Sequence, residues 1–257
     1  MINTPFRYDF VGSFLRPQAL KDAKAQLRKN EISQEEYDKV VNEEITKLVA
    51  KQKELGYQVV TDGEFRRTFW HLDFMWGFEG IGHSETETGL PFHGETAMLD
   101  DTYLIGKLSA PKEPHPFIGH FEFVHALEDP DHAAKLTIPA PAQFIEQLVM
   151  PFALENTRKY YGATEELADD LVALYRGFIA DAYAAGCRNL QFDDCSWGML
   201  VDPRAPQFFG TDDAGLADIM ELFLGVNNRA LEGRPAAVRC PAAVPSGSGH
   251  ARGPHAE

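Results

Sequence analysis

The chain has 257 residues, of which 44% are hydrophobic, so it can bury the core of one large α/β domain or of two small ones. Its formal net charge is −15 at pH 7, and it contains no run of lysines and arginines. This charge argues against a nucleic acid or an anionic membrane as partner, because both bind positive surfaces. A small-molecule substrate is expected instead.

The cysteines and the apolar runs predict a cytoplasmic protein. The chain does not open with a cationic stretch followed by an apolar one, and it contains no run of about 18 apolar residues. Its three cysteines, Cys187, Cys195 and Cys240, form no Cys-x-x-Cys pair and are odd in number, which does not indicate a disulfide framework. Cys195 is predicted to be a small buried side chain at the end of a strand.

Strands and helices alternate in the first part of the chain. Ser33 and Glu36 have the spacing of a capping box, which marks the start of a helix, and Gly56 is suited to close that helix. The β-prone run that follows breaks into Asp62-Gly-Glu64. The predicted elements are a strand at 10–13, helices at 18–30 and 33–55, and a strand at 57–61.

A hairpin-like insertion is predicted around residues 78–125, because Gly, Pro, Thr and His are frequent in much of this segment. Later, Thr164 is predicted to cap a helix that Gly186 ends, and the strand after it ends in Asp193-Asp194. The predicted elements are strands at 102–108, 117–124, 135–138 and 189–192, and helices at 143–150 and 164–186.

Alternating strands and helices predict a parallel sheet, with polar residues at the carboxyl ends of its strands. The expected fold is an α/β (β/α)8 TIM barrel, which takes eight strands and about 250 residues. With an insertion, this chain supplies about five of those strands, so we expect an incomplete barrel domain over residues 1–235.

Residues 236–257 differ from the rest of the chain. Fourteen of these 22 residues are Ala, Pro, Gly or Ser, none is Leu, Ile or Phe, and no periodicity is present. No packed element is expected there. The segment is either a natural disordered tail or a departure of the reading frame from the ancestral sequence near Pro235.

Three motifs place polar groups just past predicted strands. In the first, Val11 to Pro17, Gly12 allows close backbone approach to a ligand, and carbonyl groups beside Ser13 can accept from a substrate ammonium. Arg16 is a possible further contact. A plain tight turn is the alternative.

The other two motifs carry the acids. Glu64 can bind a cation while Arg66 and Arg67 bind a carboxylate through their forked geometry, unless they form only surface ion pairs. Asp193 is costly to bury without a partner, so a ligand ammonium or an arginine should meet it, unless it caps the next helix. Together the motifs predict a site for an amino acid with free ammonium and carboxylate groups.

The order and spacing of VGSFLRP, VVTDGEFRR, KLTIPAPAQF and LQFDD closely resemble the catalytic barrel of cobalamin-independent methionine synthases, above all the short single-barrel members. This resemblance covers roughly residues 10–235. It implies transfer of a methyl group from a methylated folate to the thiol of homocysteine, activated by zinc. The family's amino-acid-binding positions match Val11, Gly12, Ser13, Glu64 and Asp193. For the folate, Trp197 is only a stacking candidate, in a loop that reads CSWGML.

The zinc site is where the sequence departs from this family. The resemblance implies a His-x-Cys pair, a Glu and a second Cys as ligands, but the chain contains no His-x-Cys. Cys240, His250 and His255 lie at other spacings, so no metal ligand is assigned. Without zinc, a thiol with a pKa of about 8.5 is mostly protonated at neutral pH and is a weak nucleophile.

Three hypotheses therefore stay open. The chain is a homocysteine methyltransferase, a thiol alkyl-transferase or decarboxylase of the same superfamily, or a non-catalytic amino-acid-binding fragment. Because a sulfonate thiol has no ammonium, Glu64 and Asp193 favour an amino-acid thiol. An open barrel edge also predicts self-association.

Overall fold

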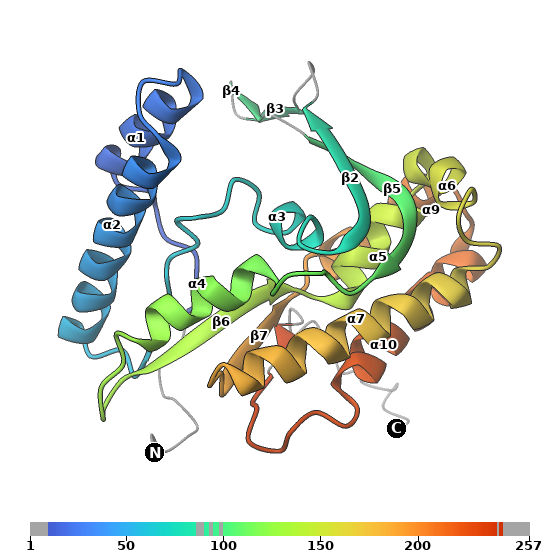
Figure 1. The fold of residues 1–257 in the computed structure, drawn as a ribbon. Coiled ribbons are helices and arrows are strands. Elements are labelled where there is room, and N and C mark those ends of the chain that lie inside the picture. The colour runs from blue at the N-terminus through green and yellow to red at the C-terminus, as the bar shows by residue number, and fades with distance from the viewer. Residues whose placement is uncertain (1–9, 86–89, 93–94, 98–99, 241, 244–257) are drawn as a thin grey trace, which may run out of the picture.

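The computed structural model describes residues 10–85, 90–92, 95–97, 100–240 and 242–243, and it shows an α/β fold (Figure 1). The helices are α1 (Gln18–Arg28), α2 (Gln34–Glu54), α3 (Leu72–Met75), α4 (Pro116–His125), α5 (Pro141–Val149), α6 (Pro151–Thr157), α7 (Thr164–Ala184), α8 (Ser196–Leu200), α9 (Ala205–Phe209) and α10 (Asp213–Leu231). The strands are β1 (Val59–Val60), β2 (Glu79–Glu85), β3 (Leu90–Phe92), β4 (Glu95–Ala97), β5 (Asp100–Ser109), β6 (Ala133–Pro139), β7 (Asn189–Asp193) and β8 (Ala242–Ala243).

The central sheet has four strands in the order β1-β6-β7-β8, and each neighbouring pair is parallel. Leu136 of β6 lies opposite Leu190 of β7. A parallel bridge also joins Ser13 to Gly63, just past β1, so the first segment of the chain reaches the same sheet. A barrel requires consecutive parallel neighbours of this kind, while closure into a (β/α)8 barrel stays a prediction.

Helices cover the sheet and bury its apolar side chains. Helix α4 packs against β6, and α10 packs against α5 and α7 (Figure 1). The hydroxyl of Tyr175, a fully buried side chain of α7, donates to the carbonyl of Pro139 at the end of β6 over 2.8 Å. Phe74 of α3 packs edge-on against Phe178 of α7, with ring centroids 5.0 Å apart. The core therefore holds the carboxyl end of β6 between helices from distant parts of the chain.

The predicted strand at 117–124 is wrong, because these residues belong to helix α4. Pro116 stands in the first turn, where its missing N–H is not needed, and the His115 ring accepts from the Phe117 N–H over 3.2 Å. Phe117, Phe121 and Val124 are then all buried at helical spacing. Their helical spacing, rather than their β propensity, decides the structure.

The hairpin character of the insertion is confirmed by β2 and β5, which pair antiparallel from Glu79 opposite Ser109 to Glu85 opposite Asp100. Two smaller expectations are wrong. The residue that caps α7 is Ala163, with no side-chain hydrogen bond, rather than Thr164. The segment after Asp194, expected to be a loop, contains helix α8.

The expected lack of a packed element from Ala236 onward is wrong for the described residues 236–240 and 242–243. Val238 is buried, and the Leu190 N–H donates to the Arg239 carbonyl over 2.8 Å. Strand β8 then pairs with the end of β7. Residues 244–257, the rest of the predicted tail, lie outside the described residues, and the domain boundary at 235 stays a prediction.

None of the helices in the described ranges is long and apolar enough to cross a membrane.

The capping box of α2 gives a direct test of the local fold. The Ser33 Oγ accepts from the Glu36 N–H over 3.2 Å, and the Glu36 carboxylate accepts from the Ser33 N–H over 2.8 Å. We expect Ser33→Ala to lower the free energy of unfolding by about 1 kcal/mol, because it leaves helix N–H groups without a partner. Urea denaturation measures the change. Ser33→Thr keeps the hydroxyl and is the matched control; equal stability of S33A and wild type would contradict the role of the cap.

Candidate functional site

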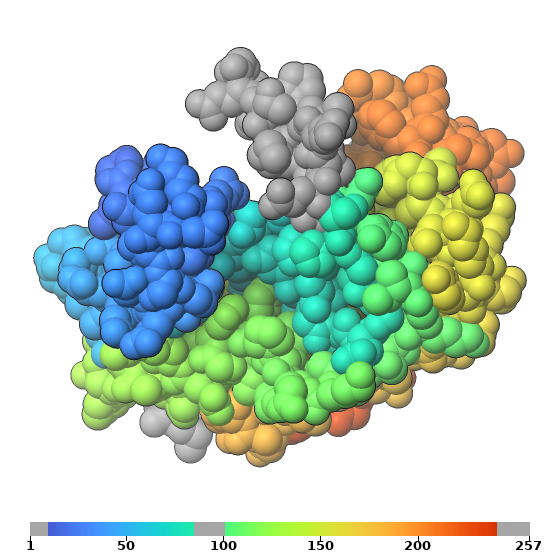
Figure 2. All heavy atoms as spheres, turned by 45° about the horizontal axis from the view of Figure 1, so that its top comes forward, coloured from blue at the N-terminus to red at the C-terminus, as the bar shows by residue number. Residues whose placement is uncertain are grey.

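Polar side chains meet at the carboxyl ends of β1, β6 and β7, the region that we call the rim. When the top of Figure 1 is tilted toward the viewer, the blue residues of α1 and α2 and the orange residues after β7 lie on opposite sides of the face, with teal residues that follow β1 between them (Figure 2). The rim side chains that carry the argument are Glu64, Thr137, Asp193 and Asp194, all of them buried.

The turn at Gly12 lies directly against β6. Gly12 has φ +140°, a conformation that residues with a side chain rarely adopt. A Cβ there would also lie only 2.7 Å from the Thr137 Cγ2, so both the backbone and the available space favour glycine. Its carbonyl accepts from the Thr61 hydroxyl over 2.7 Å, and the Val11 carbonyl accepts from Gln191 over 3.0 Å. The turn is thereby fastened to β1 and β7, while Ser13 is exposed beside the rim.

Glu64 is held in a strained backbone conformation. Its φ of +59° is in the left-handed region, which is costly for a residue with a side chain. The Asp62 carboxylate accepts from its N–H over 2.8 Å, and its carbonyl accepts from Arg16 over 2.7 Å. Strain that is maintained by several contacts is typical of functional positions.

The two arginines of the second motif point to different places. Arg67 is buried and donates to the Glu64 carboxylate over 3.0 Å, to the Trp70 carbonyl over 3.1 Å and to the Thr137 hydroxyl over 3.1 Å. Arg66 instead bonds to Asn42 of α2 and lies over the ring of Phe123 in α4. The structure therefore brings Arg67 to the rim, as the partner of Glu64, and does not bring Arg66 there.

Asp193 is a buried carboxylate at the rim that receives one side-chain hydrogen bond and lies near the charges of Arg67 and Lys135. It is 6% exposed, and Gln191 donates to it over 2.6 Å. Burial raises the pKa of Asp193 to about 6; the hydrogen bond from Gln191 opposes this shift and the nearby Glu64 charge adds to it. Within the described ranges, no lysine, arginine or histidine forms an ion pair with it.

Asp194 next to it has a structural role. One of its oxygens accepts from the Trp197 indole over 3.0 Å and from the Asn227 amide over 2.7 Å, and the other accepts from Ser196. Asp194 thus ties α8 and α10 to the end of β7 and fixes Trp197 beside the rim. It is Asp194, rather than Asp193, that bonds to the first turn of the next helix.

Sequence reasoning missed Glu146 of α5. This side chain is 4% exposed, and it accepts from Gln143 over 2.9 Å. Burial raises the pKa of Glu146 to about 7, and the Asp194 charge adds to the shift. The only sequence signal was a Gln and a Glu one helical turn apart after the KLTIPAP strand, a common pattern on exposed helices.

Cys195 was predicted to be buried, and this is wrong, because it is exposed. It follows the two aspartates directly and precedes α8. Partial burial of the thiol, followed by the charges of Asp193, Asp194 and Glu146, raises its pKa. The surroundings therefore disfavour its thiolate form.

The described residues do not fit a zinc site. Within those ranges no group of three or more His, Cys, Asp and Glu side chains is arranged to hold a metal. Cys240 is half-buried beside Cys187, and burial raises its pKa to about 12. His250 and His255 lie outside the described ranges.

The comparisons with known proteins agree with the motifs. The family model described as the catalytic domain of cobalamin-independent synthase matches residues 8–85. A crystal structure described as a putative vitamin-B12 independent methionine synthase from Listeria monocytogenes is 31% identical and superposes with a TM-score of 0.73. This chain is similar over most of its length to a structure described as a cobalamin-independent methionine synthase. The resemblance predicted from the four motifs is confirmed.

Two curated relatives extend this result. The Bacillus subtilis (strain 168) protein named "Uncharacterized protein YxjH" is 34% identical over 231 residues, which are 90% of this chain and 59% of that protein. The 5-methyltetrahydropteroyltriglutamate–homocysteine methyltransferase of Thermosynechococcus vestitus is 27% identical over 184 residues, which are 72% of this chain and 22% of that protein. The Listeria structure is matched over 94% of this chain and 65% of its own. The chain thus spans 59% of the length of the Bacillus protein and 65% of the length of the Listeria protein.

The raised pKa of Glu146 predicts a pH dependence of stability. Because its pKa in the folded protein is about 7 and its ordinary value is 4.5, its contribution to stability is full below pH 4.5 and is lost as the pH rises to 7. The loss amounts to at most about 3 kcal/mol. We expect Glu146→Gln to flatten the rise in unfolding free energy between pH 7 and pH 5, measured by urea denaturation.

Glu165→Gln, at an exposed position of α7, is the control and should keep the wild-type slope. Asp193 has a shift of the same sign and remains in both variants. An unchanged slope in E146Q would show that the pKa of Glu146 is not raised in the folded protein, and would contradict this account.

Proposed function

We propose that the rim binds the amino-acid end of homocysteine and that the chain takes part in methyl transfer from a methylated folate to its thiol. The observation that carries the proposal is Asp193, a buried carboxylate with one neutral hydrogen-bond donor and no ion pair within the described ranges. Such a group is costly unless a cation joins it, and a substrate ammonium is a cation of the right size. The family resemblance supports the choice of an amino-acid thiol.

Asp193 and Glu64 together receive the ammonium in this proposal. Glu64 is already bonded to Arg67, which holds its carboxylate in place. The two carboxylates are close enough that the Glu64 charge raises the pKa of Asp193. A bound ammonium would remove that repulsion, so it binds more strongly than it would to a single exposed carboxylate.

Arg16 is the best placed arginine for the substrate carboxylate. Its guanidinium donates to the Ser13 hydroxyl over 3.3 Å and to the carbonyls of Phe14 and Glu64, which are all uncharged groups. No carboxylate contacts it in the described part of the chain, so its positive charge is not neutralised. Val11, Gly12 and Ser13 then shape the wall beside the amino acid, as the family positions imply.

Trp197 is proposed to stack against the methyl donor. Its indole is half-buried and oriented by the hydrogen bond to Asp194. In the proposed reaction the N–CH3 bond of the folate and the S–H bond of the thiol break, an S–CH3 bond forms, and the proton ends on the folate nitrogen. Zinc remains a prediction from the family resemblance.

Binding without turnover is the second candidate. The sequence has no His-x-Cys pair, and the exposed thiol of Cys195 lies among carboxylates that keep it protonated. A rim that holds homocysteine but does not activate its thiol would give an amino-acid-binding protein. Zinc content after desalting, measured together with the methyl-transfer rate on the same sample, separates the two candidates.

Calorimetric titration tests the ammonium site. We expect L-homocysteine to bind, and 4-mercaptobutyrate, which lacks only the amino group, to bind at least about tenfold more weakly, since a charged hydrogen bond is lost. 2-Mercaptoethanesulfonate should also bind weakly. Asp193→Asn should weaken homocysteine binding by about tenfold or more, while leaving stability at pH 7 equal or higher because a buried charge is removed.

Asp218→Asn, on the exposed side of α10, is the matched control and should bind like wild type. Equal binding of homocysteine and 4-mercaptobutyrate to the wild-type chain would contradict the proposed role of the two carboxylates. So would an unchanged affinity in a folded D193N variant.

A further inference from the structure

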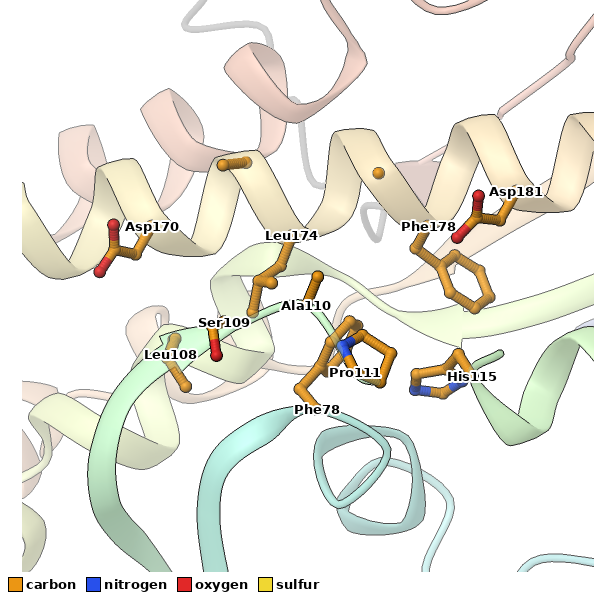
Figure 3. Close-up of a pocket in the computed structure, with 12 residues that line it drawn as sticks. Phe78, Leu108, Ser109, Ala110, Pro111, His115, Asp170, Leu174, Phe178 and Asp181 are labelled. Atoms are coloured by element: carbon orange, nitrogen blue, oxygen red, sulfur yellow. The ribbon is translucent and has the colours of Figure 1, made fainter. Parts of the chain in front are cut away.

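A second hollow lies away from the rim, between helix α7 and the segment that leads from β5 into α4 (Figure 3). It has a volume of about 220 Å³, and its deep side is made of apolar core residues, including Phe78, Leu108, Leu174 and Phe178. We call it the α7 groove. No residue of the groove belongs to the rim.

One face of α7 forms the floor of the groove. The lining residues of this helix follow at intervals of three and four, so they share a single face. Two of them, Ala173 and Gly177, have almost no side chain. A Cβ added at Gly177 would meet no atom within 4 Å, which shows that the space above this position is open.

Carboxylates stand at the two ends of this floor, Asp170 at one and Asp181 at the other, with Leu174 and Phe178 between them (Figure 3). Asp170 accepts from the Tyr161 hydroxyl over 2.8 Å, and the Lys107 ammonium is close enough to interact with it. The Asp181 side chain has no hydrogen bond or ion pair within the described ranges. Asp181 is exposed, and among the described residues no side chain neutralises its charge, so a ligand cation can reach it.

The remaining polar side chain on the deep side is His115, and it is neutral. Its ring bonds to the carbonyl of Phe74 over 2.9 Å and to the N–H of Phe117 over 3.2 Å. Burial lowers the pKa of His115 to about 4. The groove thus offers apolar contact along its length and a negative charge at the Asp181 end.

We propose that the α7 groove binds a small organic ammonium compound with an apolar body, distinct from the substrates of the rim. The apolar part lies on Leu174 and Phe178 above Gly177, and the ammonium pairs with Asp181. The volume of about 220 Å³ suits one ring with a short chain rather than a larger cofactor. This inference does not depend on the function proposed for the rim.

Titration with 2-phenylethylammonium, followed by NMR chemical shifts of the full chain, tests the proposal. We expect saturable binding of roughly millimolar affinity, because the ligand is small. The neutral 2-phenylethanol and the anionic 3-phenylpropionate should bind at least about fivefold more weakly, the effect of one partly exposed ion pair. Equal binding of all three compounds would contradict the role of Asp181, and lack of saturable binding would overturn the site.

Two variants and one control variant test whether the compound binds in this groove or elsewhere on the surface. Gly177→Leu should abolish binding, because its side chain fills the open space, whereas Gly225→Leu on α10, also with no atom within 4 Å of its Cβ, should not. Asp181→Asn should weaken binding of the ammonium compound by about fivefold and leave the affinity for 2-phenylethanol unchanged. If G177L binds as well as G225L, the compound binds elsewhere and the proposal fails. Homocysteine binding at the rim should be unaffected in all of these variants.

Discussion

The rim contains more buried carboxylates than cations, and its structure depends on how each negative charge is stabilised or neutralised. Glu64, Glu146, Asp193 and Asp194 are all at most 6% exposed. An isolated ionised carboxylate is very costly inside a protein, so each needs a cation, several hydrogen-bond donors or a proton. Glu64 has Arg67, Asp194 has three neutral side-chain donors, and Glu146 keeps a proton up to about pH 7. Asp193 has one donor, which leaves a place for a ligand cation.

The scaffold creates this arrangement through the parallel sheet. Parallel strands bring their carboxyl ends to one edge, so the residues after β1, β6 and β7 meet although they are far apart in sequence. Arg67 links two of these ends, since it bonds to Glu64 after β1 and to Thr137 on β6. Gly12 completes the contact by approaching Thr137 more closely than any larger residue could. The left-handed backbone at Glu64 is the conformational cost of placing its carboxylate there.

Local features of the sequence predicted much of this. The capping box of α2, the hairpin character of the insertion and the acids that follow β1 and β7 depend on neighbours within a few residues. The direction in which a side chain points depends instead on contacts with distant parts of the chain. Arg66 and Arg67 are adjacent and identical in chemistry, yet one contacts α2 and α4 and the other the rim, because packing around Phe117 and Phe123 decides between them. Glu146 could not be found for a similar reason, since its burial depends on contacts made by α5 within the fold.

The most direct test of this account is the pKa of Asp193, measured by carbon-detected NMR of the labelled carboxyl group with and without saturating L-homocysteine. In the free protein we expect a value of about 6, raised mainly by burial. Bound homocysteine should lower it below the ordinary value of 3.8, because an ammonium beside the carboxylate favours its ionised form. A pKa that stays near 6 while homocysteine is bound would show that the amino group lies elsewhere, and would contradict the central role of Asp193.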